Sequence, residues 1–413
     1  MPQNRIDHIT HEALNRFLSG PGLDPFFNRF TENLIYRLQS LGVGDQWTDM
    51  EDLWGLFKSK VTPAAIEAMC GSSLVSLTPS IADDLWAYDS AIPDLVKGLP
   101  RWWVPKSFVK RDHILQSIKK WHAFARTHFD ESQIGSDGDW DPKFGSEFIR
   151  SRQRTFPKMD GMDDDAVAAS DLGAIWATNT NAIPSTFWCT LECFSDPSLL
   201  SRVREEVGKC VVRTDTGKDR FDIKALGKNL LLQSIYAEAL RLRIAAFIMR
   251  SPERENMKIN EWILPKGEIV LIATTPAQMD EKMWSTGKAN EYPLDRFWAD
   301  RFLVYPGDPT SGPRKASYQE TSKVQKGEEP RFSLDDLGGS WIPYGGGFRA
   351  CPGRHFAKRE ILMTFAITVT LFDIEVDGSK ALQTDPRANG LGAQRPKNQI
   401  PFRIRKRRTH YQQ

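Results

Sequence analysis

The stretch SWIPYGGGFRACPGRHFA, residues 340–357, carries most of the information about the fold. Its glycines and prolines predict a tight loop, and the apolar periodicity that follows predicts a helix. Gly345, Gly347 and Ala350 have the spacing of a dinucleotide-binding turn, but no apolar strand leads into the loop and Pro352 would lie at the helix start. A phosphate-binding P-loop is excluded because no Lys-Ser or Lys-Thr pair follows the glycines.

Cys351 gives this loop a third interpretation. A thiolate just before a helix N-terminus is favoured by the helix dipole, and the glycines let the backbone approach a flat ligand closely. The alternative is a buried structural cysteine in a glycine-rich turn. Other segments of the chain decide between these two interpretations.

The segment WATNTNAIPSTFW, residues 176–188, brings polar side chains into an otherwise apolar helix. This helix is predicted over about residues 164–193, with the acidic residues at 160–165 at its start. Pro184 has no N–H, so the Thr180 carbonyl loses its helical donor and the turn opens beside Asn181. Asn179, Thr180, Asn181 and Ser185 can then bind water or a ligand. A proline-kinked helix with ordinary polar caps is the alternative.

A second helix, predicted over residues 230–243, contains Glu238 and Arg241. Residues at i and i+3 share a helix face, so the carboxylate and the guanidinium can pair. Such a pair alone is weak evidence for a functional motif, because surface ion pairs with this spacing are common.

Taken together, these segments resemble the cytochrome P-450 family. The pattern Tyr344-Gly345-x-Gly347-x-Arg349-x-Cys351-x-Gly353 is similar to its haem-binding signature, with tyrosine in place of the usual phenylalanine. Glu238-x-x-Arg241 is similar to the family's Glu-x-x-Arg motif. The segment YPLDRFWADRFL, residues 292–303, looks like the one that supplies an arginine, here Arg301, to a charge knot behind the haem loop.

The resemblance assigns roles to these residues. Cys351 is expected to be the axial ligand of the haem iron in a haem-binding loop over residues 341–355, which includes Tyr344, Gly345 and Gly353. Arg349 and Arg250 are expected on the haem propionates; an exposed arginine at a strand end is the alternative for Arg250. The kinked helix is expected over the opposite haem face, where Thr180 stands in for the family's acid and Asn181 for its proton-delivering threonine.

The fold class that follows is mainly α with a small β part (α+β), as one haem-thiolate domain over residues 1–413. The resemblance is firm from about 165 to 405 and faint before that. The segment LNRFLSGPGLDPFFNRF, residues 14–30, is similar to the stretch that follows the family's substrate-contacting loop. The chain is therefore expected to be N-terminally shortened, without much of the family's β-rich N-terminal region. The pattern Asn181-x-x-Pro184-x-x-Phe187-Trp188 is similar to the branch that contains sterol hydroxylases and prostacyclin synthase.

The function that the resemblance implies is insertion of oxygen into a lipophilic substrate: a terpenoid, a sterol or another secondary metabolite. Electrons are expected from NADPH through a separate reductase. Asn181 motivates a second hypothesis, a haem-thiolate isomerase or dehydratase that needs no external electrons. An inactive truncated remnant is the third.

Composition limits the partners and the location. With 55 basic and 53 acidic residues the net charge is +2, so no nucleic acid partner is expected, and only residues 402–408 stand out as basic. No run approaches the roughly 18 apolar residues of a spanning helix, and no secretory signal begins the chain, so no membrane anchor is expected in it. Five cysteines argue against a disulfide framework. We expect a protein on the cytoplasmic side, peripheral to the endoplasmic reticulum, because full-length relatives are usually membrane-bound.

Overall fold

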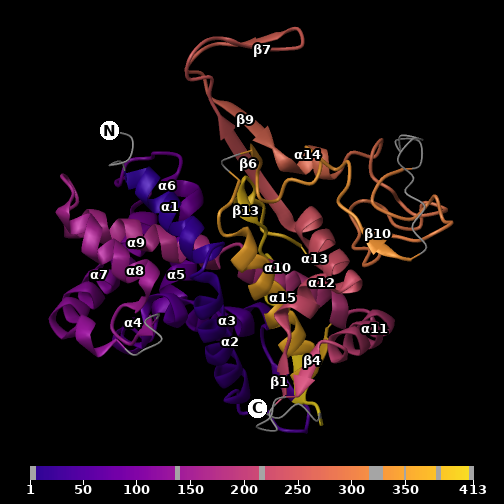
Figure 1. Cartoon of the computed structure of the whole chain (residues 1–413), viewed down its shortest axis with the longest axis horizontal. Helices are drawn as coiled ribbons and strands as arrows, with labels where there is room; N and C mark the ends of the chain where they lie inside the picture. The colour runs from indigo at the N-terminus through magenta and orange to yellow at the C-terminus, as the bar shows by residue number, and fades with distance from the viewer. Residues whose placement is uncertain are drawn as a thin grey trace. The chain divides into compact units, whose positions relative to one another are not determined.

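The computed structural model describes residues 6–134, 140–213, 219–315, 329–347, 350–377 and 383–408. They belong to two compact units (Figure 1). The first unit spans Met1–Gly227, Pro352–Gln383 and Asn398–Gln413, and the second spans Lys228–Cys351 and Thr384–Lys397. Helices predominate and the strands are short and antiparallel, so the predicted α+β class is confirmed. The single domain expected over residues 1–413 stays a prediction.

The first unit is built mainly from helices. Its helices are α1 (Ile6–Leu18), α2 (Leu23–Gln39), α3 (Leu53–Cys70), α4 (Ser72–Leu77), α5 (Ile81–Asp89), α6 (Ile92–Leu95), α7 (Pro105–His128), α8 (Glu147–Thr155), α9 (Asp164–Asn179), α10 (Ala182–Phe194), α11 (Pro197–Gly208), α12 (Ile223–Lys228, at the boundary) and α15 (Arg354–Leu371). Its strands are β1 (Thr48–Met50), β2 (Trp140–Asp141), β3 (Gly145–Ser146), β4 (Val211–Arg213), β5 (Asp219–Phe221), β12 (Phe372–Val376) and β14 (Phe402–Lys406).

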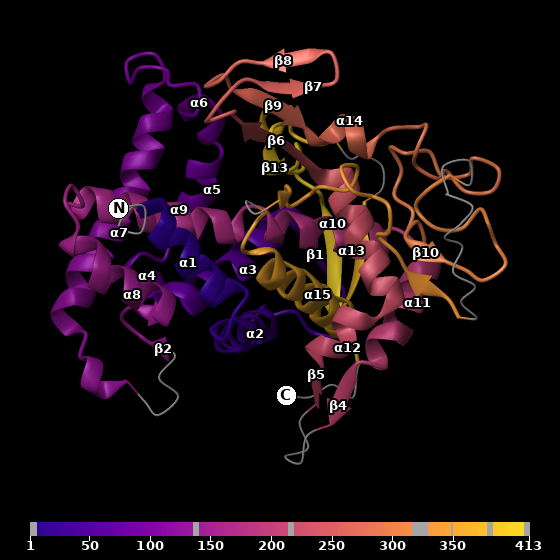
Figure 2. The same ribbon diagram turned by 45° about the horizontal axis from the view of Figure 1, so that its top comes forward.

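The core of the first unit surrounds α10, which is buried along almost its whole length. This helix packs against α15, α11 and α3, and Figure 2 shows α10 beside α15. The apolar side chains of α15 continue the core to α2, where the rings of Phe26 and Phe356 stack 4.4 Å apart. Burial of these aromatic and aliphatic faces supplies the main stabilising term of the unit.

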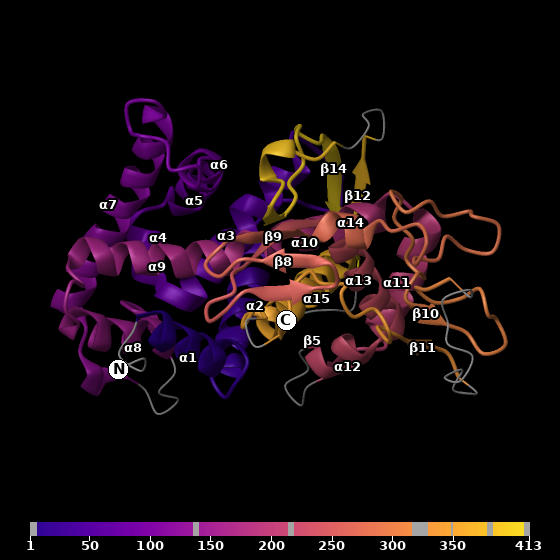
Figure 3. The same cartoon turned by 90° about the horizontal axis from the view of Figure 1, so that it is seen from above.

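A three-stranded sheet in the order β1-β14-β12 closes this unit, and Figure 3 shows β12 and β14 side by side. Ile404 lies opposite Ile374 on one side and Thr48 on the other. Along β14, Phe402 and Ile404 are buried whereas Arg403 is exposed, because successive side chains point to opposite faces of a sheet.

Two backbone segments of the first unit cross at a pair of glycines. Gly71 follows α3 and Gly145 begins β3, and both have positive φ, +89° and +68°. A Cβ atom on Gly145 would lie 2.3 Å from the Gly71 nitrogen, and one on Gly71 would lie 2.5 Å from the Pro142 carbonyl oxygen. Only glycine fits at either position.

The second unit combines one long helix with short strands. Its elements are α13 (Leu230–Arg243), β6 (Ile244–Arg250), β7 (Met257–Ile259), β8 (Trp262–Leu264), β9 (Val270–Ala273), α14 (Thr274–Gln278), β10 (Leu303–Val304), β11 (Arg331–Phe332) and β13 (Leu391–Ala393). Its largest sheet has the order β13-β6-β9, and β7 and β8 form a separate hairpin. The helix α13 has the bounds that the sequence predicts.

The helix predicted over residues 164–193 is two helices in the structure, α9 and α10, with Thr180 and Asn181 between them. The α9 start agrees with the prediction, because the Asp163 side chain accepts a hydrogen bond from the Ala166 N–H. Pro184 is the third residue of α10, where its missing N–H breaks no bond within the helix. The proline therefore begins a new helix, where the sequence indicated a kink in a continuous one.

No described helix combines the length and the apolar character that crossing a lipid bilayer requires.

Candidate functional site

The loop before Cys351 is a pair of tight turns in the second unit. Gly345 and Gly347 have φ values of +71° and +67°, a region that favours glycine. The Gly345 N–H donates to the Ile342 carbonyl at 3.1 Å, and the Cys351 N–H donates to the Tyr344 carbonyl at 2.9 Å. The loop is therefore closed on itself just before the cysteine.

Open space borders this loop. A Cβ atom at Gly345 or at Gly347 would meet no heavy atom within 4 Å, and the Cys351 side chain is exposed. A soft sulfur donor next to backbone that carries no side chains fits a flat iron-containing ligand, because thiolates bind iron well and glycines allow a close approach. The interpretation of Cys351 as a buried structural cysteine is wrong.

Two hydrogen bonds join this loop to α13. The Trp341 indole N–H donates to the Ala237 carbonyl at 3.0 Å, and the hydroxyls of Tyr344 and Tyr236 lie 2.6 Å apart. No sequence motif points to Tyr236, and Trp341 enters only as the first residue of the expected loop 341–355. Their amphipathic aromatic side chains are the only signal for them in the sequence, since a separation of more than a hundred residues predicts no contact.

The structure brings Glu238, Arg241 and Arg301 together in one buried network. Arg241 binds the Glu238 carboxylate through two nitrogens at 2.7 and 2.9 Å, and Arg301 Nε binds it at 2.9 Å. All three side chains are fully buried. Backbone carbonyls take up further guanidinium donors: those of Gln278 and Leu294 from Arg241, and that of Ser285 from Arg301.

This network keeps Glu238 ionised. Burial alone would raise the pKa of the carboxyl, but the charges and hydrogen bonds of Arg241 and Arg301 outweigh burial and hold the pKa below its ordinary value. Because Trp341 binds the neighbouring Ala237, the charged network and the cysteine loop are attached to the same turn of α13. The network is therefore placed to fix the position of the loop.

The other residues expected at the cofactor lie in different surroundings. Arg250 is exposed at the end of β6, where it donates to the Gly346 carbonyl at 3.2 Å. Gly353 is the N-cap residue of α15 in the first unit, with a φ of −78° that any residue adopts. Arg349 lies outside the described residues.

Thr180 and Asn181 lie at the break between α9 and α10 in the first unit. The Thr180 hydroxyl donates to the Trp176 carbonyl at 2.9 Å, and the Asn181 carbonyl accepts from the Ser185 hydroxyl at 2.8 Å. Asn179 is fully buried, and its Oδ1 has no hydrogen-bond partner among the described residues. A buried acceptor of this kind is costly unless water or a ligand donates to it, so the break is suited to hold an ordered water.

The first unit also contains a buried ionic cluster, which the sequence does not predict. Asp171 on α9 binds Arg152 on α8 at 2.7 Å and lies 3.0 Å from His122 on α7. Burial alone would raise the pKa of Asp171, but these two partners lower it. The cluster joins three helices, and no motif in the sequence indicates it.

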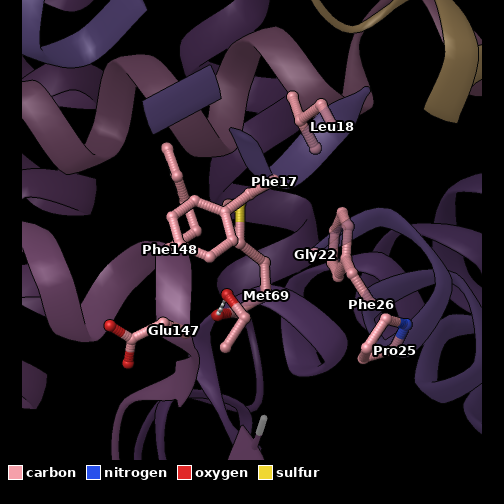
Figure 4. Close-up of a pocket in the computed structure, with 9 residues that line it drawn as sticks. Phe17, Leu18, Gly22, Pro25, Phe26, Met69, Glu147 and Phe148 are labelled. Atoms are coloured by element: carbon pink, nitrogen blue, oxygen red, sulfur yellow. Dashed lines mark hydrogen bonds between the residues drawn. The ribbon is translucent and has the colours of Figure 1, made fainter. Parts of the chain in front are cut away.

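A small pocket in the first unit lies among Phe17, Phe26, Met69 and Phe148 (Figure 4). Its volume of about 20 Å³ has room for a single water molecule. It is far too small for a lipophilic substrate.

Known proteins are similar to this chain in sequence and in fold. The profile of the cytochrome P450 family matches residues 79–402. The cytochrome P450 monooxygenase fsoE of Humicola fuscoatra is 38% identical over 410 residues, which cover 98% of this chain and 71% of that protein. The 25-hydroxycholesterol 7-alpha-hydroxylase of Rattus norvegicus is 26% identical over 268 residues, which cover 63% of this chain and 59% of that enzyme.

A solved structure agrees at the level of the fold. The cyanobacterial CYP120A1 with retinoic acid bound has a TM-score of 0.64 at 18% identity, over 98% of this chain and 80% of its own. The family match and the 38% identity to a fungal relative together show that this chain belongs to the cytochrome P450 family, and that it is a haem-dependent oxidoreductase of the monooxygenase type.

Proposed function

We propose that this cytochrome P450 inserts one oxygen atom into a C–H bond or an alkene of a terpenoid, a sterol or a similar lipophilic secondary metabolite. Electrons come from NADPH through a separate reductase. The family implies a redox partner, and this reductase is the one that we propose. The exposed thiol of Cys351, on a loop with open space beside its glycines, is the observation that carries the proposal. The fungal monooxygenase and the sterol 7-alpha-hydroxylase among the relatives support the reaction and the substrate class.

The residues of the cysteine loop would hold the haem. Cys351 would bind the haem iron through its sulfur, and Gly345 and Gly347 would let the porphyrin lie close to the backbone. Arg250 and Arg349 would bind the propionates, because a guanidinium fork matches a carboxylate. Tyr344 holds the loop to α13, and Gly353 starts the helix that follows. When bound, the haem supplies oxygen activation, and a thiolate ligand favours O–O cleavage.

The break between α9 and α10 would position the proton donor. Asn179 offers a buried acceptor, and Thr180 and Asn181 follow it in the chain. Neither an amide nor a hydroxyl titrates near neutral pH, so these side chains orient a water and do not act as general acids. The shell of buried apolar residues on α10 keeps bulk water away from this point.

Replacing Cys351 by serine tests the proposal. A serine hydroxyl is a poor iron ligand, so we expect Cys351→Ser to lose the thiolate-type Soret band of the reduced carbon monoxide complex, with a loss of activity of at least a thousandfold. The control is Cys210→Ser, because Cys210 is buried and its thiol donates to the Glu206 carbonyl at 3.4 Å. Survival of the band in Cys351→Ser, or its loss in both variants, would contradict the assignment.

A further inference from the structure

The turn between α1 and α2 makes a long-range hydrogen bond to the residue that follows Cys351. The Ser19 hydroxyl donates to the Pro352 carbonyl at 2.7 Å, although the two residues are 333 positions apart in the sequence. Both belong to the first unit. Because proline has no N–H, this carbonyl is the only backbone hydrogen-bonding group that Pro352 offers. Ser19 is therefore bound to the chain one residue away from the proposed iron ligand.

The backbone that carries Ser19 is fixed by the helix before it. The Ser19 N–H donates to the Asn15 carbonyl at 3.2 Å, and the Gly22 N–H donates to the Arg16 carbonyl at 3.3 Å. A Cβ atom on Gly22 would lie 2.5 Å from the Phe17 ring, so a larger residue there would displace this ring. The turn therefore presents the Ser19 hydroxyl from a closely packed position.

Further contacts hold α2 against the first two turns of α15. The Phe356 ring stacks on Phe26 at 4.4 Å and meets the edge of Phe30 at 6.1 Å. On the surface, Asp24 forms an ion pair with Arg359. The start of α15 cannot shift relative to α2 without breaking these contacts. The Ser19 bond extends this attachment to the residue next to Cys351.

The same bond acts on the peptide that joins Pro352 to Gly353. A hydrogen bond to a carbonyl polarises its peptide, which makes the N–H of the next residue a stronger donor. That residue, Gly353, is the N-cap of α15, where the helix dipole favours negative charge. Loss of the Ser19 hydroxyl would therefore change the charge that the Cys351 sulfur donates as well as its position.

We propose that Ser19 is a positioning residue for the iron ligand, which fixes the peptide after Cys351 through its hydroxyl. This role rests on the haem-thiolate function proposed above. Ser19 acts through the Pro352 carbonyl, and the hydrogen bonds around a metal ligand tune both its orientation and the charge it donates. The α1–α2 turn is thereby part of the site, although no motif in its sequence indicates this.

Two measurements on the haem-loaded full chain test this role: the rate of haem release to excess apomyoglobin and the reduction potential of the haem. We expect Ser19→Ala to release haem about fivefold faster, the effect of one lost hydrogen bond. Its reduction potential should fall, because a sulfur with weaker N–H support donates more charge to the iron. Ser19→Thr keeps the hydroxyl and should behave like wild type in both measurements.

Ser195→Ala is the matched control, because the Ser195 hydroxyl at the end of α10 also donates to a backbone carbonyl, that of Leu191, at 2.7 Å. It should change neither measurement. Equal changes in Ser19→Ala and Ser195→Ala, or a Ser19→Thr variant that behaves like Ser19→Ala, would overturn the role of Ser19. So would wild-type haem release and potential in Ser19→Ala, even where Cys351→Ser loses its Soret band. A Soret band that survives in Cys351→Ser would instead overturn the proposed function itself.

Discussion

At the scale of single residues, Glu360 on α15 is a buried carboxyl with no compensating partner among the described residues. Its carboxyl is fully buried, and neither oxygen has a hydrogen-bond partner among the described residues. Burial therefore raises the pKa of Glu360 well above its ordinary value. Glu360 is protonated in the folded protein under conditions where an exposed glutamate is ionised.

The pH dependence of stability follows from this shift. Above the ordinary glutamate pKa of about 4.3 the unfolded chain releases this proton and the folded protein keeps it. The free energy of unfolding then falls as pH rises, by up to about 1.4 kcal/mol per pH unit, until the folded pKa is reached. We expect Glu360→Gln to gain stability over wild type between pH 5 and pH 8 in urea unfolding, whereas the exposed Glu32→Gln gains none. A difference from wild type that is constant with pH would disprove this.

Asn181 carries a prediction at the same scale. Asn181→Ala removes a side chain from the break between α9 and α10 without touching the cysteine loop, so we expect normal haem content but several-fold less product per NADPH consumed. Thr190→Val, nine residues further along the chain and buried on α10, is the control and should leave coupling unchanged. Full coupling in Asn181→Ala would make the polar break purely structural.

At the scale of elements, the cysteine loop allows a comparison of matched glycines. Gly339 and Gly345 both have positive φ, +84° and +71°, and a Cβ atom at either would meet no heavy atom within 4 Å. An alanine at each position should therefore cost the haem-free chain a similar 1–2 kcal/mol or so. Only Gly345→Ala should weaken haem binding, by tenfold or more in a haem titration, because its methyl group would stand where we propose that the haem binds. Equal haem affinity in the two variants would remove the glycine loop from the site.

Local patterns and distant contacts differ in how far they could be predicted. The helix α13 and its Glu238–Arg241 pair follow from spacing along one helix, and Cys351 follows from a compact motif. Pro184 indicated a disturbance near Thr180, but not that it would separate two helices. The bond between Tyr236 and Tyr344 and the cluster of His122, Arg152 and Asp171 join segments far apart in the chain, and no periodicity encodes such contacts.

At the scale of the whole molecule, the second unit exposes several large apolar side chains. Among the described residues β9 pairs only with β6, and exposed side chains around this edge include Phe247, Met249, Leu271 and Ile272. Trp262 and Ile263 on the β8 strand are exposed as well. An open strand edge with apolar neighbours is a template for pairing with another chain.

We therefore expect the purified chain to self-associate through the β9 edge. Leu271→Lys should reduce the association constant at least tenfold in sedimentation velocity, because a charge on the edge opposes strand pairing. Val212→Lys, at an exposed position of β4 in the first unit, serves as the comparison and should have little effect. A wild-type chain that stays monomeric over a wide concentration range would refute this expectation.

The crossing of Gly71 and Gly145 has a consequence for how this gene can vary. Every single-codon replacement at these two positions forces a side chain into a neighbouring strand of backbone, so a saturation library selected for soluble protein should return almost nothing but glycine there. Both positions belong to the first unit, whereas the cysteine loop belongs to the second. The loss of variants at positions 71 and 145 would therefore measure the effect of a folding failure alone. The loss of variants at the cysteine loop can then be compared with it.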